Sequence, residues 1–142
     1  MGKYWFLENV AIADAAFEAQ AESLEDLFST CAQATFEVMA DTRTIQPLVK
    51  EEVELESATL DELLFDWLAE LIYLKDTHSM LFGKFDIRID QTDGYKLSAE
   101  VWGELVDQKK HKVKVDVKAV TYHLLEVKKI DEIWTAKVIL DT

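Results

Sequence analysis

The sequence predicts an α+β fold, a layered β-α-β sandwich in which two main helices pack between mostly antiparallel sheets. Two observations lead to this prediction. Segments 23–41 and 59–76 repeat apolar residues at helical spacing, and each is apolar on more than one face. Most of the remaining chain alternates apolar and polar residues in the strand period. Helices that are apolar on two faces need cover on both sides, and a single sheet with both helices on one face is the alternative.

Both predicted helices begin with a capping-box pattern. Ser23 precedes Asp26 by three residues, and Thr59 precedes Glu62 by three. In such a box the hydroxyl accepts a hydrogen bond from the backbone N–H three residues later. The two helices therefore have defined starting points.

The second helix is apolar around most of its circumference. Trp67 lies at the centre of a wide apolar face, and Phe65, Tyr73 and Leu74 extend that face past half of the helix. A helix of this kind is buried on more than one side. We expect Trp67 to lie in the core between the layers.

The strands follow from alternation and from one strong turn signal. Asp93-Gly94 predicts a tight hairpin turn between two of them. No repeat, low-complexity stretch or Pro/Gly-rich linker interrupts the chain, so residues 1–142 are predicted to form one domain. The expected strands are 4–7, 15–21, 50–57, 84–90, 95–105, 111–127 and 133–140.

Composition narrows the class of protein. The chain has 28 acidic and 15 basic residues and a net charge of −13, which disfavours stable binding to nucleic acid phosphates. Such a charge suits a basic partner or bound cations, although many soluble proteins are simply acidic. The single cysteine, Cys31, fits a core position on an apolar helix face. Without a signal peptide or an apolar run of roughly 18 residues, the chain is expected to be cytoplasmic and not associated with a membrane.

The residues that could carry catalysis are few. The sequence contains no glycine-rich phosphate loop and no Cys/His cluster with metal-ligand spacing. Its three histidines stand in different segments. An enzyme is therefore not the leading interpretation.

Two aspartates are candidate ligands for a hard cation. Asp14 stands among small apolar residues, where it is either a turn residue that bonds its own backbone or a ligand. Sites for Ca²⁺ or Mg²⁺ usually join acidic groups from distant segments. Asp141 is the natural second group, with the carbonyl or terminal carboxylate of Thr142 beside it. We expect the last strand to end at this point because its end forms part of a site.

One basic segment stands out in this acidic chain. Residues 109–115 read KKHKVKV. Lysines of this kind usually belong to a solvated loop or protect a sheet edge. The alternative is a contact for an acidic protein or a phosphate.

An ordered set of motifs resembles the archease family over nearly the whole chain. The motifs are FEVMADT, ELLFDWLAELIYLKDT, KAVTYH and the terminal KVILD. The resemblance implies a cytosolic, non-enzymatic activator of the RtcB-type tRNA-splicing RNA ligase. Such a protein promotes guanylylation of the ligase and its multiple turnover. A general interaction module or chaperone with an acidic surface and no metal role is the second hypothesis, and a metal-dependent hydrolase is the weakest.

The resemblance also implies site residues. It assigns a divalent cation, Ca²⁺ with Mg²⁺ or Mn²⁺ as alternatives, to Asp14, Asp141 and Thr142. It associates Lys118, the lysine of KAVTYH, with ligase activation. The segment ENVAIAD departs from the family pattern, because it lacks a histidine and has Ile12 where threonine is usual.

Overall fold

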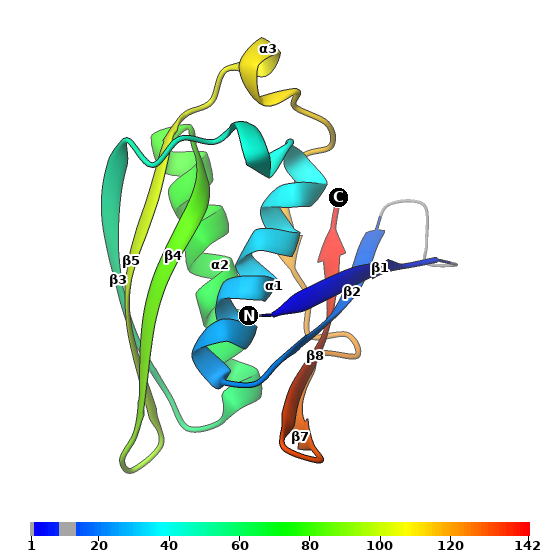
Figure 1. Ribbon diagram of the computed structural model, residues 1–142, viewed down its shortest axis with the longest axis vertical. Helices are drawn as coiled ribbons and strands as arrows, with labels where there is room; N and C mark the ends of the chain where they lie inside the picture. Colours follow the sequence, from blue (N-terminus) through cyan, green and yellow to red (C-terminus); the bar gives the residue numbers. More distant parts are fainter. Residues whose placement is uncertain (1, 9–13) are drawn as a thin grey trace.

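The computed structural model describes residues 2–8 and 14–142 and has three layers (Figure 1). A three-stranded antiparallel sheet forms one outer layer, and a five-stranded sheet forms the other. Helices α1 (Leu24–Met39) and α2 (Leu60–His78) lie between them and contact strands of both sheets. The predicted β-α-β sandwich is confirmed, and the single-sheet alternative is wrong.

The three-stranded sheet is built around a hairpin. Strands β4 (Met80–Gln91) and β5 (Tyr95–Leu105) pair, and β3 (Val49–Ser57) pairs with the other side of β5. Asp93 and Gly94 adopt positive φ values of 50° and 100° at the turn. This backbone shape matches the right-handed twist of the flanking strands, which is why an Asp-Gly pair indicates a hairpin.

The five-stranded sheet joins the two ends of the chain. Strand β8 is central, because it pairs with β2 on one side and with both β6 and β7 on the other. Strand β1 pairs with the outer edge of β2. The bounds are β1 (Lys3–Leu7), β2 (Asp14–Ala21), β6 (Ala119–Val120), β7 (Glu126–Ile130) and β8 (Ile133–Asp141).

The predicted starting points of both helices are confirmed. The Ser23 hydroxyl accepts a hydrogen bond of 3.1 Å from the Asp26 N–H. The Thr59 hydroxyl accepts one of 3.2 Å from the Glu62 N–H. Each cap satisfies a backbone donor that has no partner within the helix.

The core lies between the sheets and contains Trp67 and Cys31. The Trp67 side chain is fully buried, and its indole N–H donates a 3.0 Å hydrogen bond to the Phe28 carbonyl. Cys31 is also fully buried, and burial raises the pKa of its thiol. Both residues occupy the core positions expected from the sequence.

One residue that was predicted to extend the buried apolar face of α2 is exposed instead. Leu74 is buried and Phe65 is half-buried, but Tyr73 is 59% exposed. Two sheets cover two sides of a helix and leave its remaining side open. At Tyr73 the neighbouring strand is only the two-residue β6, so the cover is incomplete.

The prediction of one strand over 111–127 is also wrong. This part begins at the last residue of the short helix α3 (Gln108–His111) and continues through an irregular stretch, β6 and a turn into β7. The irregular stretch leads from the three-stranded sheet to the five-stranded sheet, so it has no continuous strand partner. It is held instead by helix residues. The Lys75 ammonium lies 2.6 Å from an Asp116 carboxylate oxygen, and the Lys114 N–H donates a 2.7 Å bond to the Met39 carbonyl.

Two smaller features complete the described chain. A single turn of 3₁₀ helix, η1 (Thr42–Thr44), follows α1. None of the helices in the described ranges is long and apolar enough to cross a membrane.

Candidate functional site

Asp14 and Asp141 lie directly opposite each other in the antiparallel pair of β2 and β8. Opposed residues in such a pair point to the same face of the sheet, with Cβ atoms about 4.5–5.5 Å apart. Figure 1 shows the beginning of β2 and the end of β8 at the same end of the five-stranded sheet. The structure therefore brings together two carboxylates that are 127 residues apart in sequence (141 − 14).

The carboxylate pair lies on the outer face of the five-stranded sheet. Leu140, whose side chain belongs to the core, points to the opposite face. Ala16 and Ile139 form the next row on the same face as the pair, and they are only 2% and 5% exposed. Asp14 and Asp141 are themselves half-buried. Two like charges beside buried apolar groups repel each other, and a cation or a proton between them relieves the repulsion.

The donor set fits a hard cation but does not complete its shell. Thr142 follows Asp141 directly and is half-buried. Two carboxylates and a carbonyl provide only oxygen ligands, which suit Ca²⁺ or Mg²⁺. Ca²⁺ takes six to eight oxygens, and within the described ranges no group of three or more His, Cys, Asp or Glu residues gathers as a metal site. Water or oxygens of a partner would have to supply the remaining ligands.

Lys118 lies next to the pair through its backbone. Its N–H donates a 2.8 Å hydrogen bond to the Asp141 carbonyl. Two residues later, Val120 lies opposite Leu140 and joins the core, so this side of β6 faces the helices. Lys118 lies just before β6 and, with Ala119 and Val120, lines a groove against α2.

The sequence departure before Asp14 falls outside the described residues. Ile12 and its neighbours from 9 to 13 belong to this part of the chain. Asp14 itself is described.

Two lysines of the basic segment 109–115 pair with carboxylates within the protein. The Lys110 ammonium lies 2.7 Å from a Glu104 carboxylate oxygen, and the Lys114 ammonium lies 3.4 Å from one of Glu37. These lysines pair with carboxylates of the same chain, as is common for lysines beside a sheet. Their positions offer no support for a phosphate site at these two lysines.

Glu104 and His111 form a buried polar cluster that was not predicted. His111 is fully buried, and its Nδ1 accepts a 2.9 Å hydrogen bond from the Asp107 N–H. Its Nε2 lies 3.1 Å from a Glu104 carboxylate oxygen. Burial acts to raise the pKa of Glu104, but bonds from Lys110, the Gln46 N–H and His111 outweigh it and lower the pKa to about 2. The cluster fixes the connection after β5.

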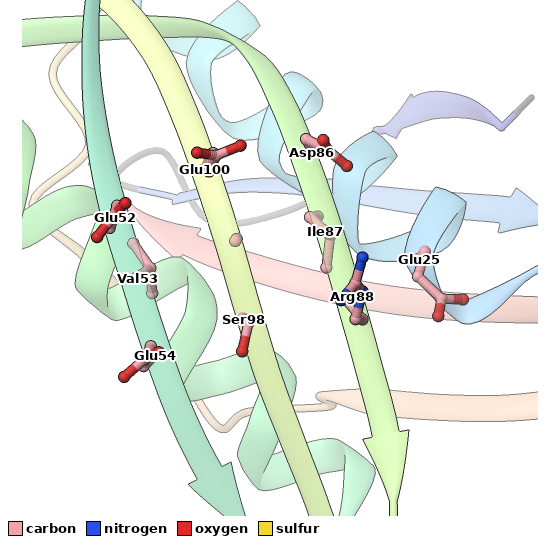
Figure 2. Close-up of a pocket in the computed structure, with 10 residues that line it drawn as sticks. Glu25, Glu52, Val53, Glu54, Asp86, Ile87, Arg88, Ser98 and Glu100 are labelled. Atoms are coloured by element: carbon pink, nitrogen blue, oxygen red, sulfur yellow. The ribbon is translucent and has the colours of Figure 1, made fainter.

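The outer face of the three-stranded sheet is acidic. Glu52, Glu100 and Asp86 stand in one row across its strands, because each lies opposite its neighbour in the register. Figure 2 shows these carboxylates on the strands of the sheet, with Arg88 nearby. They line an open hollow of about 490 Å³. The alternating charges of KEEVELES and KFDIRID are the sequence signals for this face. The Lys50 ammonium lies 2.9 Å from a Glu100 carboxylate oxygen and 3.9 Å from one of Glu52, so part of the negative charge is balanced within the chain.

Comparisons with known proteins agree with the fold. Residues 4–142 match the model of the Archease protein family. The chain is 41% identical over 130 residues to protein archease of Methanothermobacter thermautotrophicus, covering 91% of this chain and 92% of that protein. It is 38% identical over 131 residues to protein archease of Thermococcus gammatolerans, with coverage of 91% and 92%.

Two solved structures are similar over most of the chain. The solution structure of Methanobacterium thermoautotrophicum protein 1598 has a TM-score of 0.85 at 38% identity and covers 98% of both chains. A crystal structure of an archease from Thermotoga maritima, described as a possible chaperone, has a TM-score of 0.64 at 22% identity and covers 93% of both chains. The second match shows likeness of fold.

Proposed function

Because the chain belongs to the archease protein family, we propose that it is a non-enzymatic activator of an RtcB-type tRNA-splicing RNA ligase. In this proposal it promotes guanylylation of the ligase by GTP and allows repeated turnover. Family membership supports the identity of the partner. The position of Asp14 opposite Asp141 is the observation that supports a site for the activity.

The chain's own residues would hold a divalent cation at one end of the sheet. Asp14 and Asp141 supply carboxylates, and the Thr142 carbonyl supplies a further oxygen. When bound, the cation would supply positive charge that can orient a triphosphate. Val138 and Leu140 are fully buried and anchor β8, so the carboxylate of Asp141 is presented from a fixed strand.

The orientation of the pair suits action on a partner. Its side chains point away from the helices, on the outer face of the sheet. A net charge of −13 disfavours stable direct binding of RNA by this chain. We therefore infer that the partner ligase, and not this protein, holds the RNA in the cytoplasm.

A guanylylation assay tests the proposal. Purified ligase is incubated with GTP labelled in its α-phosphate, with and without this protein at one-tenth of the ligase concentration. The expected result is faster and more complete labelling of the ligase, with no GTP hydrolysis by this protein alone. If the protein hydrolysed GTP by itself and left labelling of the ligase unchanged, the proposal would be wrong.

The acidic face of the three-stranded sheet favours a second function. In this alternative the protein is a general interaction module or chaperone that recognises basic partners without a metal. Glu52 and Glu54 are exposed on that face. The double substitution Glu52→Gln and Glu54→Gln would then weaken partner binding, whereas chelation of divalent ions would have no effect.

A further inference from the structure

The carboxylate pair belongs to a row of three side chains on the outer face of the five-stranded sheet. Strand β8 has a neighbour on each side, so Asp141 lies opposite Asp14 of β2 and also opposite Ala119 of β6. Opposed residues point to the same face of a sheet, with Cβ atoms about 4.5–5.5 Å apart. Two positions of the row therefore carry carboxylates, and the third carries only a methyl group.

Hydrogen bonds hold Ala119 in this place although β6 is only two residues long. Before it, the Lys118 N–H donates a 2.8 Å bond to the Asp141 carbonyl. After it, the N–H and the hydroxyl of Thr121 both donate to the Ile139 carbonyl, at 3.1 and 2.9 Å. The register of β6 against the end of β8 is thus fixed on both sides of Ala119.

The pair is open on the side where Ala119 lies. Ala119 is exposed, whereas Asp14 and Asp141 are half-buried. Because β6 is the edge strand, Ala119 borders both the outer face and the groove against α2. In the next row of the outer face, Ala16 and Ile139 are buried and apolar. These described neighbours of the pair carry no side-chain oxygen, and the exposed one among them is Ala119.

The residue at position 119 decides how many ligands the protein itself can supply. Ca²⁺ takes six to eight oxygens, and Asp14, Asp141 and Thr142 supply only part of them. A carboxylate at position 119 would lie in the same row and add one more ligand from the protein. A methyl group adds none and takes up little space, so an oxygen of another molecule can approach Asp141 from this side.

We propose that Ala119 keeps the β6 side of the carboxylate pair free for an anionic oxygen of the ligase complex, which completes the ligand set begun by Asp14 and Asp141. The identity of the partner rests on the proposed function, whereas the role of Ala119 rests on the register of β6. The oxygen belongs either to a phosphate of the bound nucleotide or to a carboxylate of the ligase. Both are ligands that a hard divalent cation accepts.

Calcium binding tests the position of Ala119 without the ligase. Isothermal titration calorimetry gives the Kd for Ca²⁺ of the unsubstituted protein and its variants. Ala119→Asp should bind Ca²⁺ about tenfold more tightly, because it adds a charged ligand. Ala119→Leu adds no ligand and should keep the Kd of the unsubstituted protein. Ala58→Asp is the matched control and should also keep it, since Ala58 is an exposed alanine between β3 and α2.

Ligase guanylylation tests whether the open side is used. At saturating Ca²⁺, Ala119→Asp and Ala119→Leu should each lower the stimulation by at least about tenfold, because the first fills the free ligand position and the second covers it. Ala119→Ser keeps the side chain small and should stimulate like the unsubstituted protein. Ala58→Asp and Ala58→Leu should do the same. Circular dichroism checks that each variant is folded.

The source of the oxygen follows from how complex formation depends on the nucleotide. Binding of the unsubstituted protein and of Ala119→Leu to purified ligase is measured with and without GTP. If Ala119→Leu binds more weakly only with GTP, the oxygen belongs to a phosphate of the nucleotide. Equal weakening in both conditions assigns it to a carboxylate of the ligase.

Several results would overturn the inference and leave the proposed function intact. An unchanged Kd for Ca²⁺ in Ala119→Asp would show that residue 119 does not border the site. Full stimulation by both Ala119→Asp and Ala119→Leu would show that water alone completes the ligand set. Unweakened ligase binding by Ala119→Leu, with GTP and without it, would show that no partner oxygen enters there.

Failure of the proposed function gives a different result. In that case the unsubstituted protein itself would leave guanylylation of the ligase unchanged at saturating Ca²⁺. The assignment of the entering oxygen to the ligase complex would then be wrong as well.

Discussion

Asp14 and Asp141 lie directly opposite each other on the outer face of the sheet, beside the buried row of Ala16 and Ile139. Like charges directly opposite each other across strands are destabilising. The fold nevertheless holds them there, because the buried residues of β2 and β8 fix the register. A shift by one residue would turn the apolar face of β8 toward solvent. The packing of the core therefore keeps the two carboxylates opposed although they repel each other.

Divalent ions should stabilise the protein through this pair. At a concentration one hundred times its dissociation constant, a ligand bound only by the folded state adds about 2.7 kcal/mol to the free energy of unfolding. We expect Ca²⁺ to raise the Tm of the unsubstituted protein by several degrees and to leave that of Asp141→Asn unchanged. Thermal unfolding with CaCl₂ and with chelator measures this.

The same experiment has an internal check. Without divalent ions, Asp141→Asn should be at least as stable as the unsubstituted protein, because it removes the repulsion. Asp86→Asn on the other sheet serves as the control and should respond to Ca²⁺ like the unsubstituted protein. Equal Ca²⁺ shifts in all three proteins would exclude the pair as the binding site.

Ligase activation should depend on both carboxylates. Asp14→Ala and Asp141→Ala should each remove most of the stimulation of guanylylation, since one carboxylate cannot replace two ligands. Measured without divalent ions, each should change the free energy of unfolding by less than about 1 kcal/mol, because the side chains are only half-buried. Full stimulation by either variant, with Asp86→Ala as the reference, would contradict the proposed site.

Trp67 should be the most sensitive core position of α2. Trp67→Ala should lower the free energy of unfolding by about 3–5 kcal/mol, because it leaves a large cavity and removes the bond to the Phe28 carbonyl. Trp67→Phe keeps most of the ring volume and should be less destabilising. Urea unfolding followed by circular dichroism compares the two, and equal losses would show that cavity size is not the main cause.

The cluster of Glu104 and His111 should make the free energy of unfolding depend on pH. The pKa of Glu104 is lowered from its ordinary value of 4.5 to about 2 in the folded protein. A lowered carboxyl pKa stabilises the fold above the unfolded-state pKa, and this stabilisation is lost as the pH falls from about 4.5 through about 2. Glu104→Gln should therefore be less stable at pH 7 and lose less stability over that window. Unfolding curves of the two proteins from pH 7 to pH 2 measure the difference, and parallel pH profiles would contradict it.

The sequence by itself determined the elements whose causes are local. The hydroxyls of Ser23 and Thr59 cap helices within three residues, and Asp93-Gly94 sets the hairpin within its own turn. The burial of Trp67 followed from the apolar circumference of its own helix. Each of these features depends on short-range geometry or on helical periodicity, which the chain carries in its order of residues. The archease family resemblance likewise rests on residues in order, and it agrees with the family match over residues 4–142.

Only the tertiary structure decided how distant segments meet. Segment 111–127 alternates like a strand, but its residues are used to cross between sheets, where Lys75 and Met39 bind its backbone and side chains. The pairing of Asp14 with Asp141 comes from the register of β2 against β8, and no local pattern encodes that register. Alternate side chains of every strand point to opposite faces of the sheet. Only the packing of the core decides which of these faces is turned inward.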